Sequence, residues 1–362
     1  MKITKNFRLK NLVTPLLDRR RPVYSWFLMK ESFSSALVHL LADSWRLGKE
    51  DFVYDPFCGA GTVPLACQER GINCLGCEIH PVLFFISKVK TREYEIAGIQ
   101  KFANEILSSK FEKVEIDTAR KLERVFPRGF LEDIAFFRQK ISEIDSEDVR
   151  ELLLLALRNA ALRAGGVSRD GVVLRKGKGG ENLKVALKKE VERMVGDLKI
   201  FQRKKCLTKL EFKDARKMKP EKPVSAIITS PPYLMKEEYI SEYGLEEWLF
   251  GTPVQNKELF LNFSSPGSTI EETAERYFQN LEIAIARLFD ACGAGARVCF
   301  VVSDGGSRDG VVEVCEKTGE IAKEVGFKVK KILVVNERWC TTPSRKKIGK
   351  MREALLFWEK KP

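Results

Sequence analysis

The stretch DPFCGAGTV, residues 55–63, follows a short apolar run at 52–54 and precedes a helix that we expect over 63–70. A buried strand that turns directly into a helix is the first half of a βαβ unit. Glycines at positions 59 and 61 permit positive φ angles and leave room for a ligand to approach the main chain. This stretch therefore predicts a strand, a ligand-binding turn and a helix.

The same unit continues with a strand expected over 73–77, which ends at Glu78, and a helix over 81–90. Glu78 follows Gly61 by 17 residues, close to the spacing at which an acidic side chain accepts the ribose hydroxyls of a nucleoside cofactor. No third glycine follows Gly61, since residues 62–64 are Thr-Val-Pro, and this disfavours a pyrophosphate seat. A cofactor with adenosine but no phosphate fits better, and S-adenosylmethionine is such a molecule.

A second motif, TSPPY at residues 229–233, follows the apolar run 224–228. Proline cannot donate to a sheet ladder or continue a helix. The motif therefore predicts a stiff loop at the carboxyl end of a buried strand. In open α/β sheets, ligands bind at that end.

The rest of the chain alternates between strand and helix patterns on both sides of a long helical stretch. We expect strands at 210–214, 224–228, 296–302 and 328–335, an antiparallel partner at 354–358, and helices at 31–47 and 273–288. The helical stretch contains GGVSRDGVVLRKGKGG, residues 165–180, which predicts a glycine-rich basic loop or hairpin. The predicted fold is α/β, with a mostly parallel, doubly wound sheet, an antiparallel C-terminal strand and a helical basic insertion.

We divide the chain into four parts. These are a basic N-terminal segment with a flanking helix (1–50), the first half of the core (51–94), the helical basic insertion (95–205) and the second half of the core with the TSPPY loop (206–362).

The charge of the chain is strongly positive. Lys plus Arg number 63 against 50 Asp plus Glu, a net charge of +13, which favours a polyanionic partner such as nucleic acid. Charge that only maintains solubility is the alternative. No apolar run reaches the roughly 18 residues of a membrane span, and no signal peptide is recognisable, so we expect a cytoplasmic protein without a membrane partner.

The nine cysteines are scattered and do not suggest a disulfide framework. Cys74 and Cys77 have the spacing of half a zinc site, but no second pair completes it, so we expect them to pack in a strand and expect no metal.

Two motifs together resemble a known family. Phe57-Cys58-Gly59-Ala60-Gly61 and Ser230-Pro231-Pro232-Tyr233 match the FxGxG and [D/N/S]PP[Y/F/W] loops of the amino-methyltransferases of nucleic acids. Those are Rossmann-like, class I enzymes that use S-adenosylmethionine to methylate N4 of cytosine or N6 of adenine. The resemblance covers roughly 20–90 and 205–360 and includes the segment YSWFLMKESFSSALV, residues 24–38, but not the insertion.

The resemblance implies roles for individual residues. Catalysis would fall to the loop residues Ser230, Pro231, Pro232 and Tyr233. The serine hydroxyl and the Pro231 carbonyl would accept the amino hydrogens of a base that stacks on Tyr233. The implied cofactor-binding residues are Asp55, Phe57, Cys58, Gly59, Gly61, Thr62, Glu78, Ile79, Asp214, Ala215, Phe33 and Ser34.

For the methylated base and for the polymer that contains it, the sequence leaves several alternatives. By the resemblance, serine at position 230 favours N4 of cytosine over N6 of adenine, and no cysteine follows a proline, which excludes C5 chemistry. No large recognition domain follows the core, which favours structured RNA such as rRNA over DNA. A non-catalytic nucleic-acid-binding protein and a protein-glutamine methyltransferase are further alternatives, and Ser230 fits the second one poorly.

Contacts to the substrate would come from the insertion and from a loop at 336–352. The residues we expect there are Arg169, Arg175, Lys176, Arg345 and Lys346.

Overall fold

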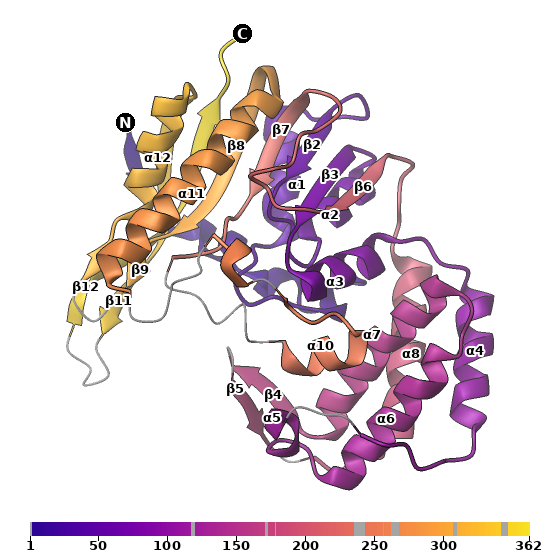
Figure 1. Cartoon of the computed structure of the whole chain (residues 1–362). Coiled ribbons are helices and arrows are strands. Elements are labelled where there is room, and N and C mark those ends of the chain that lie inside the picture. The colour runs from indigo at the N-terminus through magenta and orange to yellow at the C-terminus, as the bar shows by residue number, and fades with distance from the viewer. Residues whose placement is uncertain are drawn as a thin grey trace.

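A computed structural model gives the structure of the chain (Figure 1). It describes residues 2–116, 120–170, 173–177, 179–234, 243–255, 257–261, 268–306, 310–341 and 347–362. No helix in these ranges is long and apolar enough to cross a membrane.

One eight-stranded sheet forms the centre of the molecule, in the order β1-β11-β12-β8-β7-β2-β3-β6. The strands are β1 (Ile3–Lys5), β2 (Phe52–Asp55), β3 (Asn73–Glu78), β6 (Thr208–Phe212), β7 (Val224–Thr229), β8 (Cys292–Ser303), β11 (Lys328–Thr341) and β12 (Lys347–Glu359). Strands β6, β3, β2, β7 and β8 are parallel, and β12 is antiparallel to both β8 and β11. This confirms the predicted Rossmann-like α/β class with an antiparallel C-terminal strand.

Helices cover both faces of the sheet. The helices of the core are α1 (Ser35–Trp45), α2 (Thr62–Arg70), α3 (Pro81–Thr91), α11 (Ile270–Ala291) and α12 (Val314–Val325). Alternation along β8 decides which side chains meet which layer: Phe300 packs in the cluster with α11 and α12, whereas Val301 packs in the cluster with α1 and α2. Figure 1 shows α11 and α12 on one side of the sheet with α1 and α2 behind it.

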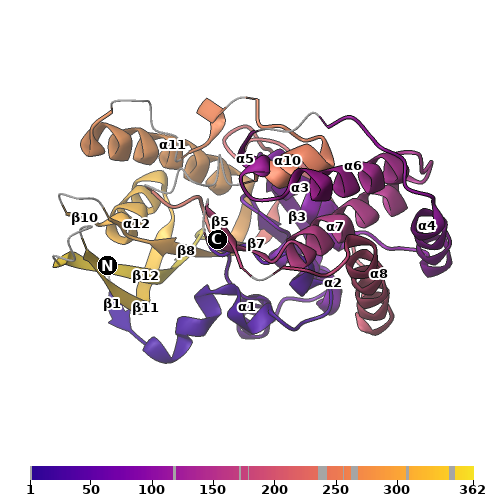
Figure 2. The ribbon, with the colours of Figure 1, turned by 90° about the horizontal axis from the view of Figure 1, so that it is seen from below.

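The helical part of the chain packs beside α3. It contains α4 (Ile96–Ser108), α5 (Arg120–Glu123), α6 (Arg128–Ser142), α7 (Glu147–Ala164) and α8 (Leu183–Ile200), with the hairpin of β4 (Val167–Asp170) and β5 (Val173–Lys176) between the last two. Helix α10 (Gly244–Phe250) packs against α3 and α7. Figure 2, viewed from below, shows this bundle next to the sheet.

Two regions are more regular than their composition suggests. Within the first 30 residues, β1 pairs in parallel with β11 and residues Tyr24–Trp26 form a short 3-10 helix. The stretch 336–352 is not simply a loop, because residues Asn336–Thr341 and Lys347–Glu353 continue the β11–β12 ladder. Hydrogen bonding to a neighbouring strand extends the strands into regions whose composition, with Pro, Gly and many charges, does not favour strand structure.

Candidate active site

The turn between β2 and α2 depends on its two glycines. Gly59 and Gly61 have φ angles of 51° and 80°, which side chains with a Cβ rarely adopt. A Cβ on Gly61 would lie 3.1 Å from the Ser87 Cβ in α3. Glycine at position 61 therefore also allows the start of α2 to pack closely against α3.

The carboxylate of Glu78, at the end of β3, fixes this turn. Its Oε2 accepts a hydrogen bond from the Gly59 amide at 2.8 Å, and its Oε1 accepts from the amides of Ile79 at 2.9 Å and His80 at 2.8 Å. Burial raises the pKa of Glu78, and the three backbone N–H groups oppose that rise. A carboxylate has about four lone-pair sites, so a ligand hydroxyl still finds an acceptor at Oε2.

Asp55 connects the first motif to the second. Its Oδ1 accepts from the Thr229 hydroxyl at 2.6 Å and from the Phe57 amide at 3.2 Å. The side chain is 2% exposed, and this burial raises the pKa of Asp55 to about 7. Because Thr229 directly precedes Ser230, the carboxyl group at the end of β2 helps to position the Ser-Pro-Pro-Tyr loop.

That loop, which follows β7, is held from two sides. The Ser230 hydroxyl donates to the Val301 carbonyl of β8 at 3.1 Å and lies 3.4 Å from the Tyr233 hydroxyl. From α11, the buried Tyr277 donates its hydroxyl to the Pro232 carbonyl at 2.9 Å. Since the serine proton points to Val301, the lone pairs of its oxygen are available as acceptors.

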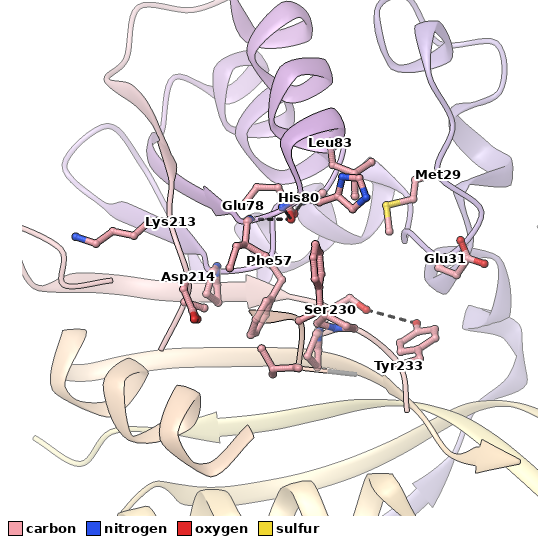
Figure 3. A pocket seen from close by; sticks show the side chains of 18 residues that line it. Met29, Glu31, Phe57, Glu78, His80, Leu83, Lys213, Asp214, Ser230 and Tyr233 are labelled. Carbon is pink, nitrogen blue, oxygen red and sulfur yellow. Dashed lines mark hydrogen bonds between the residues drawn. The ribbon is translucent and has the colours of Figure 1, made fainter. Parts of the chain in front are cut away.

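The two motifs line one cavity. Figure 3 shows Asp214 at one end, Glu78 and Phe57 in the middle, and Ser230 and Tyr233 at the other end. The cavity lies at the carboxyl ends of β2 and β7. From β2 the sheet continues to β3 and β6 on one side and to β7 and β8 on the other, so the strand order changes direction between β2 and β7. Ligands of doubly wound sheets bind at this point.

Most of the expected site residues lie on the cavity wall. These are Phe57, Gly59, Glu78, Ile79, Asp214, Ala215, Ser230, Pro231, Pro232 and Tyr233.

Six expected cofactor residues are not among the lining residues. Asp55 and Thr62 lie beneath the wall, Gly61 caps α2, and Cys58 is buried against β3. The remaining two, Phe33 and Ser34, are buried where α1 begins, and Phe33 packs with the cluster around α1 and α2. The apolar ring of Phe33 is needed in that cluster, so these two residues contact the core instead of the cavity.

Sequence reasoning missed eight lining residues. They are Met29, Glu31, Pro56, His80, Leu83, Lys213, Phe260 and Leu261. For Pro56, His80 and Lys213, adjacency to an expected residue was a usable signal. No local pattern marks Met29 or Phe260, which reach the cavity from distant parts of the chain.

Asp214 lines the cavity with its carboxylate engaged by Arg216. Its Oδ1 accepts from the Arg216 amide at 2.9 Å, and its Oδ2 pairs with the guanidinium at 2.6 Å. The same guanidinium donates to the Leu259 carbonyl at 2.8 Å and to Asn280 of α11. Arg216 therefore ties the Asp214 wall to α11.

The expected substrate residues lie away from this cavity or cannot be assessed. Arg169 lies on β4, and Arg175 and Lys176 lie on β5, whose antiparallel pairing confirms the hairpin alternative for the glycine-rich stretch. Arg345 and Lys346 lie outside the described residues. Within the described ranges, no group of three or more His, Cys, Asp or Glu side chains is arranged to hold a metal ion.

Comparison with curated proteins gives relatives that span nearly the whole chain. The type II methyltransferase M.BsoBI of Geobacillus stearothermophilus is 24% identical over 99% of this chain and 89% of its own length. M.AvaI of Nostoc sp. strain PCC 7120, also a type II methyltransferase, is 23% identical over 90% of this chain and 83% of its own. These relatives identify the chain as a methyltransferase. Its cofactor is S-adenosylmethionine.

No protein-family model matches the methyltransferase. Among solved structures, a TehB-like SAM-dependent methyltransferase from Corynebacterium glutamicum aligns with a TM-score of 0.33 at 10% identity, over 90% of this chain and 87% of that one. The sheet order described above establishes the fold independently of this likeness.

The cavity fits the cofactor of the methyltransferase. Glu78 offers a buried acceptor for ribose hydroxyls, and the positive-φ turn at Gly59 keeps side chains away from the ligand. Ile79 and Leu83 supply apolar wall next to Glu78.

Proposed function

We propose that this methyltransferase methylates the exocyclic N4 amine of cytosine in DNA. The observation that carries the proposal is the shared cavity, in which the glycine turn and Glu78 face Ser230, Pro231, Pro232 and Tyr233. A methyl donor and an amine acceptor must lie within about 3–3.5 Å of each other for transfer, and one cavity provides that proximity.

The cofactor would be held by the turn and by the ends of β3 and β6. Glu78 binds the ribose, the Gly59 backbone borders the methionine part, and the wall at Asp214 and Ala215 borders the adenine. When bound, S-adenosylmethionine supplies an electrophilic methyl group on a sulfonium.

The substrate amine would be held by the loop after β7. An exocyclic amine is a weak nucleophile because its lone pair is delocalised into the ring. Acceptors on its two hydrogens favour a tetrahedral nitrogen, and Ser230 Oγ has free lone pairs because its own proton goes to Val301. Pro231 would present its carbonyl as the second acceptor, held in place by the rigid diproline before the reaction begins.

Tyr233 lines the same end of the cavity and would stack on the target base. Stacking on an aromatic ring contributes roughly 1–3 kcal/mol per base, which offsets part of the cost of turning the base out of a duplex.

The choice of base and polymer follows from two observations. Serine at position 230, in place of Asp or Asn, favours cytosine by the resemblance described above. The whole-length relatives are type II methyltransferases, a designation for enzymes of DNA modification, so we now favour DNA over the structured RNA that the sequence alone favoured. The net charge of +13 suits either polymer.

The decisive experiment offers the purified protein radiolabelled S-adenosylmethionine with duplex DNA, rRNA or tRNA. The products are digested to nucleosides and identified by mass spectrometry. With the unmodified protein we expect label in N4-methyldeoxycytidine. The Ser230→Ala variant is the control and should give little label. Label in N6-methyldeoxyadenosine or in a ribonucleoside would contradict the proposed base or polymer. Cofactor binding without label in any nucleic acid would favour the non-catalytic alternative.

A further inference from the structure

The ends of β11 and β12 form a two-stranded ribbon that projects beyond the sheet. The last pair between β12 and β8 joins Glu353 to Ser303, whereas β11 and β12 remain paired as far as Thr341 and Lys347. Figure 1 shows the two strands continuing past the end of β8, at the same edge as the carboxyl end of β7. We call residues Asn336–Thr341 and Lys347–Glu353 the ribbon.

One face of the ribbon is covered by the small hairpin of β9 (Gly305–Gly306) and β10 (Val311–Val312). A Cβ on Gly306 would lie 2.6 Å from the Cys340 Sγ and 2.7 Å from the Met351 Sδ, and a Cβ on Gly349 would lie 2.7 Å from Val311. This close packing holds the ribbon in place.

The other face carries an exposed tryptophan and two lysines. Trp339 is 50% exposed and is the only exposed one among the five tryptophans, all of which the structure describes. Directly across the ladder from it is Lys350, whose Nζ lies 5.4 Å from the ring centroid, and the Nζ of Lys347 lies 4.8 Å from it. Leaving a tryptophan ring in water is costly, and the two lysines beside the ring favour a negatively charged partner for this surface.

We propose that this face of the ribbon binds the nucleic acid several base pairs away from the target base, with Trp339 against a base or sugar and Lys347 and Lys350 at phosphates. The inference rests on the proposed function, because it takes the substrate to be a nucleic acid. A two-stranded β-ribbon fits the major groove of DNA, and proteins that bind single strands combine aromatic side chains with cations in the same way.

The distance from the catalytic loop sets the part of the substrate that the ribbon reaches. Ser230 is bonded to Val301, which pairs with Leu355, and Lys350 lies five residues further along β12. At about 3.4 Å per residue this is about 17 Å along the strand. With a rise of about 3.4 Å per base pair, the ribbon reaches about five base pairs from the target. It therefore contributes to binding and not to the methyl transfer step.

The test measures binding of a fluorescein-labelled DNA duplex of mixed sequence to the full-length protein over a range of salt concentrations. Trp339→Ala should raise the Kd about tenfold and leave kcat at saturating DNA unchanged, with partial recovery in Trp339→Phe. The double variant Lys347→Ala/Lys350→Ala should lower the slope of log Kd against log salt by about 2.

Lys331→Ala is the matched control. Lys331 also lies over an aromatic ring of the same two strands, at 4.8 Å from the Phe357 centroid, but within the part of the sheet that pairs with β8. This variant should keep both the Kd and the salt slope of the unmodified protein. Equal melting temperatures of all variants would exclude loss of folding as the cause.

The outcomes separate this inference from the proposed function. If the unmodified protein methylates DNA but the ribbon variants bind it as tightly as Lys331→Ala does, the ribbon inference is wrong and the function stands. A lower kcat with unchanged Kd in Trp339→Ala would also overturn it. If the unmodified protein methylates no nucleic acid, the proposed function itself fails.

Discussion

The turn after β2 and the loop after β7 line the same cavity, but different groups stabilise them. The first is held through its backbone, since the Gly59 amide binds the buried Glu78 carboxylate and two glycines take positive φ angles. The second is held through side-chain hydroxyls, with Ser230 bonded to Val301 and Tyr277 bonded to Pro232.

This difference indicates that the turn after β2 and the loop after β7 have different roles. A turn built from backbone groups and one carboxylate can bind a cofactor but offers no reactive group of its own. A stiff loop with a free hydroxyl acceptor can orient an amine. Changes in the first should therefore affect cofactor affinity, and changes in the second should affect turnover.

The strongest test of this division is Ser230→Ala. Removal of one preorganised hydrogen-bonding group at a reacting centre lowers kcat by about 100-fold or more. We expect that loss in single-turnover methyl transfer, with cofactor affinity unchanged in calorimetry. Full turnover in this variant would show that the hydroxyl is not the acceptor.

Glu78→Ala addresses the opposite side of the cavity. The variant leaves the amides of Gly59, Ile79 and His80 without their acceptor and removes the ribose contact. Hydrogen bonds to charged groups contribute about 1.5–3 kcal/mol, so the Kd of the cofactor should rise about 10- to 100-fold. Calorimetric titration with S-adenosylmethionine measures it. Glu78→Gln, which keeps one oxygen acceptor, should lose less, and an equal loss in both variants would argue that only the charge matters.

A smaller effect is expected from Tyr277→Phe, which removes the hydrogen bond to the Pro232 carbonyl. A net loss of about 1 kcal/mol in loop positioning corresponds to about a fivefold decrease in kcat. Steady-state methylation assays check this. Tyr94→Phe is the control, because its hydroxyl donates to the Val89 carbonyl at 2.7 Å, away from the cavity lining. A similar fall in kcat in both variants would indicate a general loss of stability instead.

The most specific test concerns Asp55, which joins the two regions. Its pKa is about 7 in the fold, against 3.8 for the free side chain, so the folded protein retains this proton where the unfolded chain releases it. The contribution to stability is therefore complete below about pH 4 and is lost as the pH rises to about 7, with a slope of at most about 1.4 kcal/mol per pH unit.

Asp55→Asn cannot titrate, so its free energy of unfolding lacks this decline. Urea denaturation at several pH values should show the variant gaining stability relative to the unmodified protein up to about pH 7, with a constant difference above it. Parallel profiles would show that Asp55 does not carry a raised pKa.

Local sequence patterns were sufficient to predict most helices and strands and the two motifs that form the site. Whereas the antiparallel last strand begins at Lys347, well before its predicted start at residue 354, the βαβ unit around the glycine turn and the strand before the Ser-Pro-Pro-Tyr loop were predicted close to their observed positions. The reason is that hydrophobic periodicity, glycine and proline act on neighbouring residues. Phe33 and Ser34, expected at the cofactor, are buried at the start of α1 and do not line the cavity, because a helix start alone does not reveal which layer its side chains meet.

By itself, then, the sequence determined the two motifs, their order and the serine that distinguishes the loop. Only the tertiary structure decided that the Thr229 hydroxyl reaches Asp55 across 174 residues, that Met29 and Phe260 complete the wall, and that Trp339 lies on a projecting ribbon. Such contacts depend on strand order and on packing between distant segments. The physical preferences of adjacent residues do not specify them.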